Sequence, residues 1–175
     1  MEARDLLKSM KSQSCHPSEI TYTSVLDACA SSSDGESRVA CDFALELLSK
    51  MEEEDVCRGG PTEMHVLTVA ALCSRCGYWE AARGLWRRYG AGRGGVLHAA
   101  AIAACGAAGL HKQALEVLRE VPSRQRDGLA YARAAEACAK AGQTPLVFEL
   151  LEEAKGLEIK RDRGIYHAAI RALGN

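Results

Sequence analysis

Apolar residues recur at helical spacing along most of this chain. Ala114, Val117, Leu118 and Val121 follow the i, i+3, i+4, i+7 pattern of one helical stripe. A stripe of smaller side chains precedes it and comprises Val96, Ala99, Ala100, Ala103 and Ala104. The pattern predicts α-helices of roughly a dozen residues, joined two by two.

A glycine ends each alanine- and cysteine-rich segment at a nearly constant interval. Gly77, Gly109 and Gly142 stand 32 and 33 residues apart. Glycine readily adopts the positive φ that ends a helix, so each should form the turn of a helical hairpin. Thr144-Pro145 should start the next helix, with Thr144 as its N-cap and Pro145 in the first turn.

One hairpin cannot bury its apolar face alone, so the hairpins must stack. We therefore expect an all-α fold, a right-handed α-solenoid of stacked helix-turn-helix repeats that forms one array over residues 1–175. Its expected parts are a second helix of an incomplete repeat (1–18), four repeats (19–62 with insertions, 63–94, 95–127 and 128–162) and a first helix of an incomplete repeat (163–175).

Two segments of the first repeat carry a family resemblance. Thr21-Tyr22-Thr23 and the stretch Ala44–Met51, which reads Ala-Leu-Glu-Leu-Leu-Ser-Lys-Met, resemble the first and second helices of a pentatricopeptide repeat. The resemblance covers nearly the whole chain, although Val66 and His98 replace the tyrosine in the second and third repeats. Tetratricopeptide repeats have a similar period, but their Trp and Gly in the first helix and their Ala-Phe pair are missing.

The resemblance implies a non-catalytic module that binds single-stranded RNA on its concave face, about one base per repeat, in organellar RNA processing or metabolism. It implies base-edge contacts from the residue after the tyrosine and the last residue of each repeat: Thr23 with Thr62, Leu67 with Gly94, Ala99 with Asp127, and Ala132 with Asp162. Ser18 and His167 hold such positions in the incomplete repeats. It further implies that an apolar side chain at each first-helix start packs against the bases: Ile20, Met64, Val96 and Leu129.

These positions offer little for reading a base sequence. Leu, Ala and Gly provide no side-chain hydrogen bonds, so we expect sequence-tolerant binding. Charge distribution favours a polyanion: eleven acids and three bases lie between Glu19 and His65, but nine bases and three acids between Ser74 and Arg126. Arg83, Arg87 and Arg88, together with Arg93, are the expected phosphate contacts.

Other chemical signals have plainer explanations. Gly90–Gly95 matches G-x-G-x-x-G but follows a predicted helix, so we expect an inter-repeat linker. Cys73-x-x-Cys76 with His65 upstream could suggest zinc, yet Cys73 shares its repeat position with Cys29, Cys105 and Cys138, which indicates a small buried side chain. We expect no metal, no cofactor, no small-molecule substrate and no enzymatic activity.

Two alternatives stay open beside RNA binding by an independent module. One is a protein–protein interaction scaffold that uses the same concave surface. The other is the RNA-docking arm of a larger RNA-processing enzyme. Family resemblance alone places the chain in a chloroplast or mitochondrion, and Met1–Leu7 shows no presequence pattern. No apolar run approaches the ~20 residues of a membrane-spanning helix, so no membrane is expected.

Overall fold

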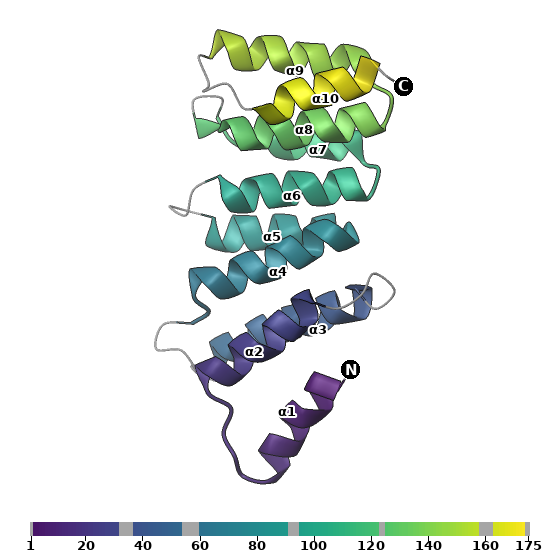
Figure 1. Ribbon diagram of the computed structural model, residues 1–175. Coiled ribbons are helices and arrows are strands. Elements are labelled where there is room, and N and C mark those ends of the chain that lie inside the picture. The colour runs from purple at the N-terminus through teal and green to yellow at the C-terminus, as the bar shows by residue number, and fades with distance from the viewer. Residues whose placement is uncertain are drawn as a thin grey trace. The chain divides into compact units, whose positions relative to one another are not determined.

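A computed structural model describes residues 2–31, 37–53, 60–90, 95–122, 125–157 and 163–173 (Figure 1). The regular elements in these ranges are ten α-helices: α1 (Glu2–Ser12), α2 (Glu19–Ala30), α3 (Ser37–Glu53), α4 (Glu63–Cys76), α5 (Trp79–Tyr89), α6 (Val96–Ala107), α7 (His111–Arg119), α8 (Gly128–Lys140), α9 (Thr144–Gly156) and α10 (Arg163–Leu173). The predicted all-α class is confirmed for this part of the chain.

The chain divides into two compact units, residues 1–72 and 73–175, and the division falls inside α4. Within the first unit α1 packs against α2, and α2 against α3. Within the second unit α6, α8 and α10 pack side by side, and we call them the first-helix layer. We call α5, α7 and α9 the second-helix layer, since each follows or precedes a first helix in a hairpin. This sequential packing is that of an α-solenoid, as the repeat predicts.

Three glycines end first helices in the left-handed conformation. The φ angles of Gly77, Gly109 and Gly142 are 68°, 74° and 69°. The amide after each glycine donates to a cysteine carbonyl five residues earlier: Tyr78 to Cys73 at 3.0 Å, Leu110 to Cys105 at 2.9 Å, and Gln143 to Cys138 at 2.9 Å. This Schellman-type closure confirms the predicted hairpin turns.

The repeated cysteine position is part of the core. Cys73, Cys105 and Cys138 are fully buried, and Cys29 is nearly so. Burial raises the pKa of the Cys105 and Cys138 thiols to about 11. Both thiols therefore stay protonated and unreactive near neutral pH, which fits small core side chains.

The start of α9 departs from the expected N-cap. Gln143 occupies the cap position without a side-chain hydrogen bond, and Thr144 is the first helical residue. The Thr144 hydroxyl donates instead to the Ala172 carbonyl of α10, at 3.1 Å. The capping role predicted for Thr144 was wrong because a tertiary contact takes its hydroxyl, while Pro145 lies in the first turn as expected.

Candidate nucleic-acid interface

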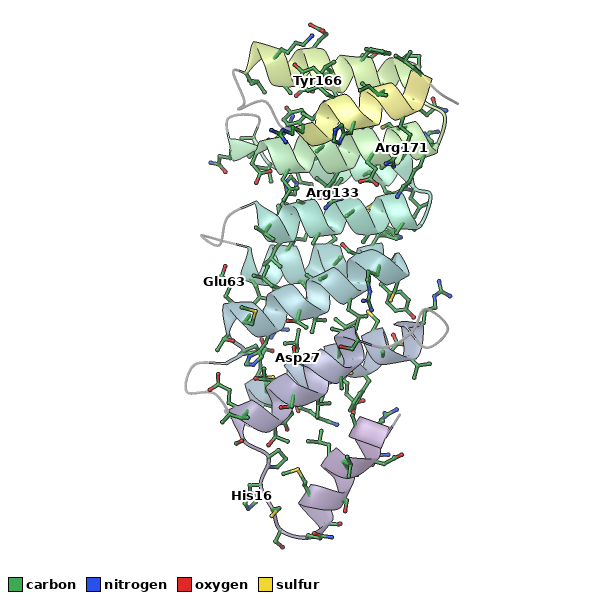
Figure 2. The ribbon with its side chains drawn as sticks, viewed as in Figure 1. His16, Asp27, Glu63, Arg133, Tyr166 and Arg171 are labelled. Carbon is green, nitrogen blue, oxygen red and sulfur yellow. The ribbon has the colours of Figure 1, made fainter. Side chains whose placement is uncertain are left out.

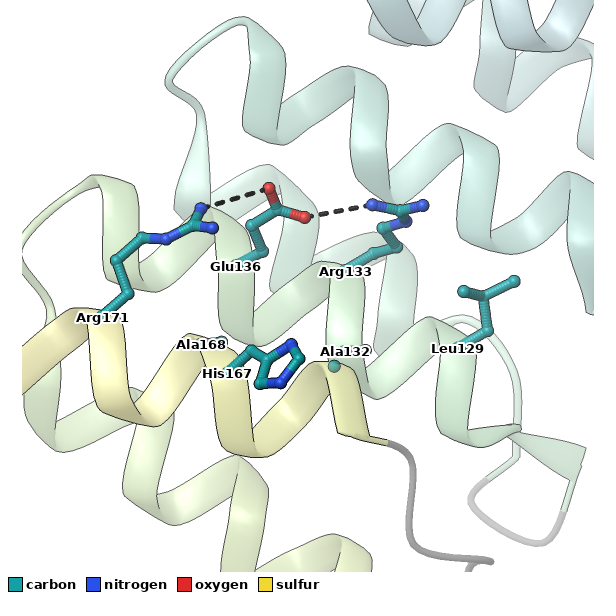
Figure 3. A pocket seen from close by; sticks show the side chains of 8 residues that line it. Leu129, Ala132, Arg133, Glu136, His167, Ala168 and Arg171 are labelled. Atoms are coloured by element: carbon teal, nitrogen blue, oxygen red, sulfur yellow. Dashed lines mark hydrogen bonds and ion pairs between the residues drawn. The ribbon is translucent and has the colours of Figure 1, made fainter.

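A groove lies between α8 and α10 in the first-helix layer (Figure 3). Its volume is about 380 Å³, near the lower end of small-ligand sites. Small residues form its floor, since Ala132 and Ala168 are buried and Gly164, which also lines the groove, has no side chain. Leu129 and His167 line the remaining wall. The groove therefore exists because the facing positions of the two helices carry almost no side-chain volume.

One carboxylate in this groove lies among three cations. Glu136 Oε2 accepts from Arg133 Nη1 at 3.1 Å. Glu136 Oε1 lies 3.3 Å from Lys140 Nζ and 3.6 Å from Arg171 Nη1. Burial favours the protonated carboxyl, but Lys140 and Arg133 outweigh this effect and hold the pKa of Glu136 below its ordinary value. The cluster thus carries three positive charges and one negative charge at neutral pH.

The resemblance-based positions at this groove are Ala132, Leu129 and His167. Ala132 forms part of the floor and Leu129 is partly buried beside it, while His167 is exposed on α10. Figure 3 shows the His167 ring between the two helices, below the Glu136 carboxylate. The structure therefore brings three predicted positions to one groove.

In the unit of residues 1–72, a histidine joins the predicted pair Thr23 and Thr62. His65 Nε2 lies 2.8 Å from Thr23 Oγ1, and His65 Nδ1 accepts from the Thr62 backbone N–H at 3.1 Å. Because this N–H can only donate, Nδ1 carries no proton, and Nε2–H must donate to Thr23. The Thr23 hydroxyl in turn donates to the Glu19 carbonyl at 2.9 Å.

His65 is deeply buried in this arrangement. Its side chain is 3% exposed, and burial lowers its pKa although Glu19 and Asp27 act in the opposite direction. In the sequence, His65 stands out only as a residue upstream of Cys73 and Cys76. Its position three residues after Thr62 could have indicated a contact with that residue. Its contact with Thr23, however, depends on the packing of α4 near α2.

Asp127 has a structural role in the second unit. Its Oδ1 accepts from the Ala130 backbone N–H at 2.8 Å as the N-cap of α8. A Cβ added to Gly95, at the start of α6, would collide with the same carboxylate. The anion thus lies near two helix N-termini, where it is electrostatically favourable.

The other base-contact candidates differ in exposure. Ala99 is buried and Leu67 is partly buried. Gly94 and Asp162 lie outside the described residues, as do most of the Gly90–Gly95 linker and Arg93.

Three of the four predicted base-packing residues are exposed apolar side chains. Ile20 is 77% exposed, Met64 65% and Val96 51%. Each lies at the start of a first helix, as the resemblance implies for these positions. Their exposure leaves them accessible to a ligand.

The predicted phosphate contacts lie on α5 in the second-helix layer. Arg83 and Arg87 both pair with Glu120 at the end of α7, and the Arg87 Nη2 distance is 3.1 Å. Arg88 lies over the Tyr89 ring, 5.6 Å from its centroid. These residues are therefore not brought together with the groove between α8 and α10.

The cations around Glu136 are not among the residues that the sequence predicted as phosphate contacts. Arg133, Glu136 and Lys140 stand at helical spacing on α8, a signal that was available, and Arg171 follows the predicted position His167 by one helical turn. Figure 2 shows Arg133 and Arg171 on neighbouring helices of the same layer.

Among the residues described, no three His, Cys, Asp or Glu side chains are placed to hold a metal ion. The described helices include none with the length and apolar character needed to cross a membrane. No protein-family model matches the chain, and no curated protein sequence matches it.

Proposed function

We propose that this chain is a non-catalytic helical-repeat module of the pentatricopeptide type that binds single-stranded RNA. The groove between α8 and α10 is its best-defined nucleotide position. One observation carries the proposal: residues at base-contact positions, Ala132 and His167, line a groove whose ionic cluster has two excess positive charges.

The chemistry of the groove suits a nucleotide without favouring one base. A small apolar floor can accept the flat face of any base, while guanidinium and ammonium groups pair with phosphate. His167 is the polar side chain in the groove that could hydrogen-bond a base edge. Binding should therefore depend mainly on phosphate contacts, which position a strand but do not read its sequence.

The test is a titration of a fluorescently labelled oligouridine at 50 and 150 mM salt. The double variant Arg133→Gln/Arg171→Gln should weaken binding about tenfold, because two phosphate contacts are lost. The matched control is Arg83→Gln/Arg87→Gln, which removes the same charge from the second-helix layer and should change affinity less than about threefold. Circular dichroism melts verify that both variants fold.

Equal losses in the two double variants would contradict a site in the groove and would favour general attraction by the basic middle of the chain. No binding by the unaltered chain even at 50 mM salt would rule out the RNA proposal.

A protein partner is the second candidate, and residues 1–72 carry the observation in its favour. Ile20 and Met64 are exposed there beside the acidic residues Glu19 and Glu63, which would repel RNA and suit a basic peptide. The variant Ile20→Ser/Met64→Ser distinguishes the two roles. RNA affinity should fall if these side chains pack against bases, and should stay unchanged if this face serves a protein.

A further inference from the structure

Glu136 lies among cations from two helices at the groove. Both of its oxygens are engaged, Oε2 by Arg133 and Oε1 by Lys140 and Arg171. The cations come from two neighbouring first helices, α8 and α10, so the carboxylate joins consecutive repeats across the groove (Figure 3).

The cations are more accessible than the anion that holds them. The side chains of Arg133, Lys140 and Arg171 are 47%, 50% and 54% exposed, whereas that of Glu136 is 31% exposed. A ligand that approaches from solvent can therefore reach the cations before the carboxylate. Ion pairs between side chains this exposed are weak, so an incoming phosphate can replace Glu136 as the partner of these cations.

We propose that Glu136 is an internal competitor for the nucleic-acid phosphate, and that RNA must displace its carboxylate from Arg133, Lys140 and Arg171 in order to bind. This inference rests on the proposed function and adds a regulatory element to the same site. Glu136 limits affinity without selecting a base, because it competes with phosphate, which is the same in every nucleotide.

The competitor has a distinct physical signature in binding. Each cation that pairs with a phosphate of a single strand adds about 0.7 to the slope of log affinity against log salt. Because RNA displaces Glu136, the same three cations reach phosphate with or without this carboxylate. Removal of Glu136 should therefore raise affinity and leave the slope unchanged.

The decisive experiment compares Glu136→Gln with Glu120→Gln in the oligouridine titration. Glu120 is the matched control, because it is also a carboxylate between two guanidinium groups, those of Arg83 and Arg87, but lies in the second-helix layer. Glu136→Gln should bind about five times more tightly at 50 mM salt, with the same slope of log affinity against log salt. Glu120→Gln should bind like the unaltered chain, although its net charge changes equally.

A third variant separates charge from shape. Glu136→Asp keeps the carboxylate and should retain the affinity and slope of the unaltered chain. The proposal is overturned if Glu136→Asp binds as tightly as Glu136→Gln, if Glu120→Gln gains as much as Glu136→Gln, or if Glu136→Gln gains nothing while the unaltered chain binds. Absence of binding in every variant overturns the proposed function as well, which distinguishes the two failures.

One measurement needs no substitution and covers the case in which Glu136→Gln does not fold. The carboxyl carbon resonance of Glu136 can be followed against pH in the free chain and with saturating oligouridine. Displacement from its cations should raise the pKa of Glu136 in the complex. An unchanged titration on binding would contradict the proposal.

Discussion

Two polar side chains at the tyrosine position of first helices, His98 and Tyr131, are buried and hydrogen-bonded. His98 is buried, and its Nε2 donates to the Val117 carbonyl at 2.8 Å. Tyr131 is fully buried, and its hydroxyl donates to Glu153 at 2.7 Å. Val66, which holds the same position in the second repeat, is also fully buried, so the position requires a filled volume, and any polar group placed there needs a hydrogen-bond partner. This is why histidine at residue 98 can hold the position that tyrosine holds at residues 22 and 131.

Acidification should destabilise the chain through its two buried histidines. Burial is the main cause that lowers the pKa of both His65 and His98 from the ordinary 6.5. The folded state thus binds fewer protons than the unfolded chain, so their contribution is complete above pH 6.5 and is lost as pH falls through the folded pKa values. Urea denaturation at pH 7.5 and 5.5 should show a lower free energy of unfolding at pH 5.5.

The double variant His65→Gln/His98→Gln should flatten this pH dependence, whatever its stability at pH 7.5. His16→Gln, at an exposed position, serves as the control and should keep the full dependence. If the double variant loses as much stability on acidification as the unaltered chain, the buried histidines are not the cause.

The hairpins follow from short-range rules that the sequence displays. Two local features close each of these first helices. One is a glycine in the left-handed region, and the other is a hydrogen bond from the next amide to the carbonyl five residues before it. The same local logic fails at Thr144, whose hydroxyl has a more distant acceptor in Ala172. Local signals thus predict where an element ends more reliably than which partner a polar side chain selects.

Alanine substitutions at the turn glycines test this account of the hairpins. Gly109→Ala and Gly142→Ala should each cost about 1 kcal/mol of unfolding free energy, because the left-handed backbone strains any Cβ although nothing lies within 4 Å. Gly77→Ala should cost more, since its Cβ would also lie 3.1 Å from the Ala108 backbone nitrogen.

Gly84→Ala is the control for this series. Gly84 lies inside α5 with no atom within 4 Å of an added Cβ, so alanine should stabilise by about 0.5–1 kcal/mol. Urea denaturation measures all four variants. Similar losses at Gly84 and Gly109 would show that backbone conformation is not what these glycines provide.

Over the whole molecule, a net charge of −1 conceals segregated acids and bases. RNA binding at the groove should therefore depend on salt through a few cations and not through the total charge. If Arg133, Lys140 and Arg171 each contact phosphate of a single strand, the slope of log affinity against log salt should be about −2. Affinity should then fall about 15- to 20-fold between 50 and 200 mM salt, as measured by fluorescence anisotropy.

Neutralising all three cations should bring this slope close to zero. A slope that persists in the triple variant would place the phosphate contacts elsewhere, with Arg83 and Arg87 as the first alternatives.

The sequence by itself determined the helical hairpins, their glycine turns and the buried cysteine position, because these depend on apolar spacing and on hydrogen bonds between near neighbours. Through the resemblance it also indicated Ala132 and His167 as base-contact positions and Leu129 as a base-packing position. Only the tertiary structure decided that Glu136 lies among cations from two helices, and that His65 joins Thr23 to Thr62. Those contacts depend on how closely helices of different repeats pack, and that distance is set by small side chains on both partners at once.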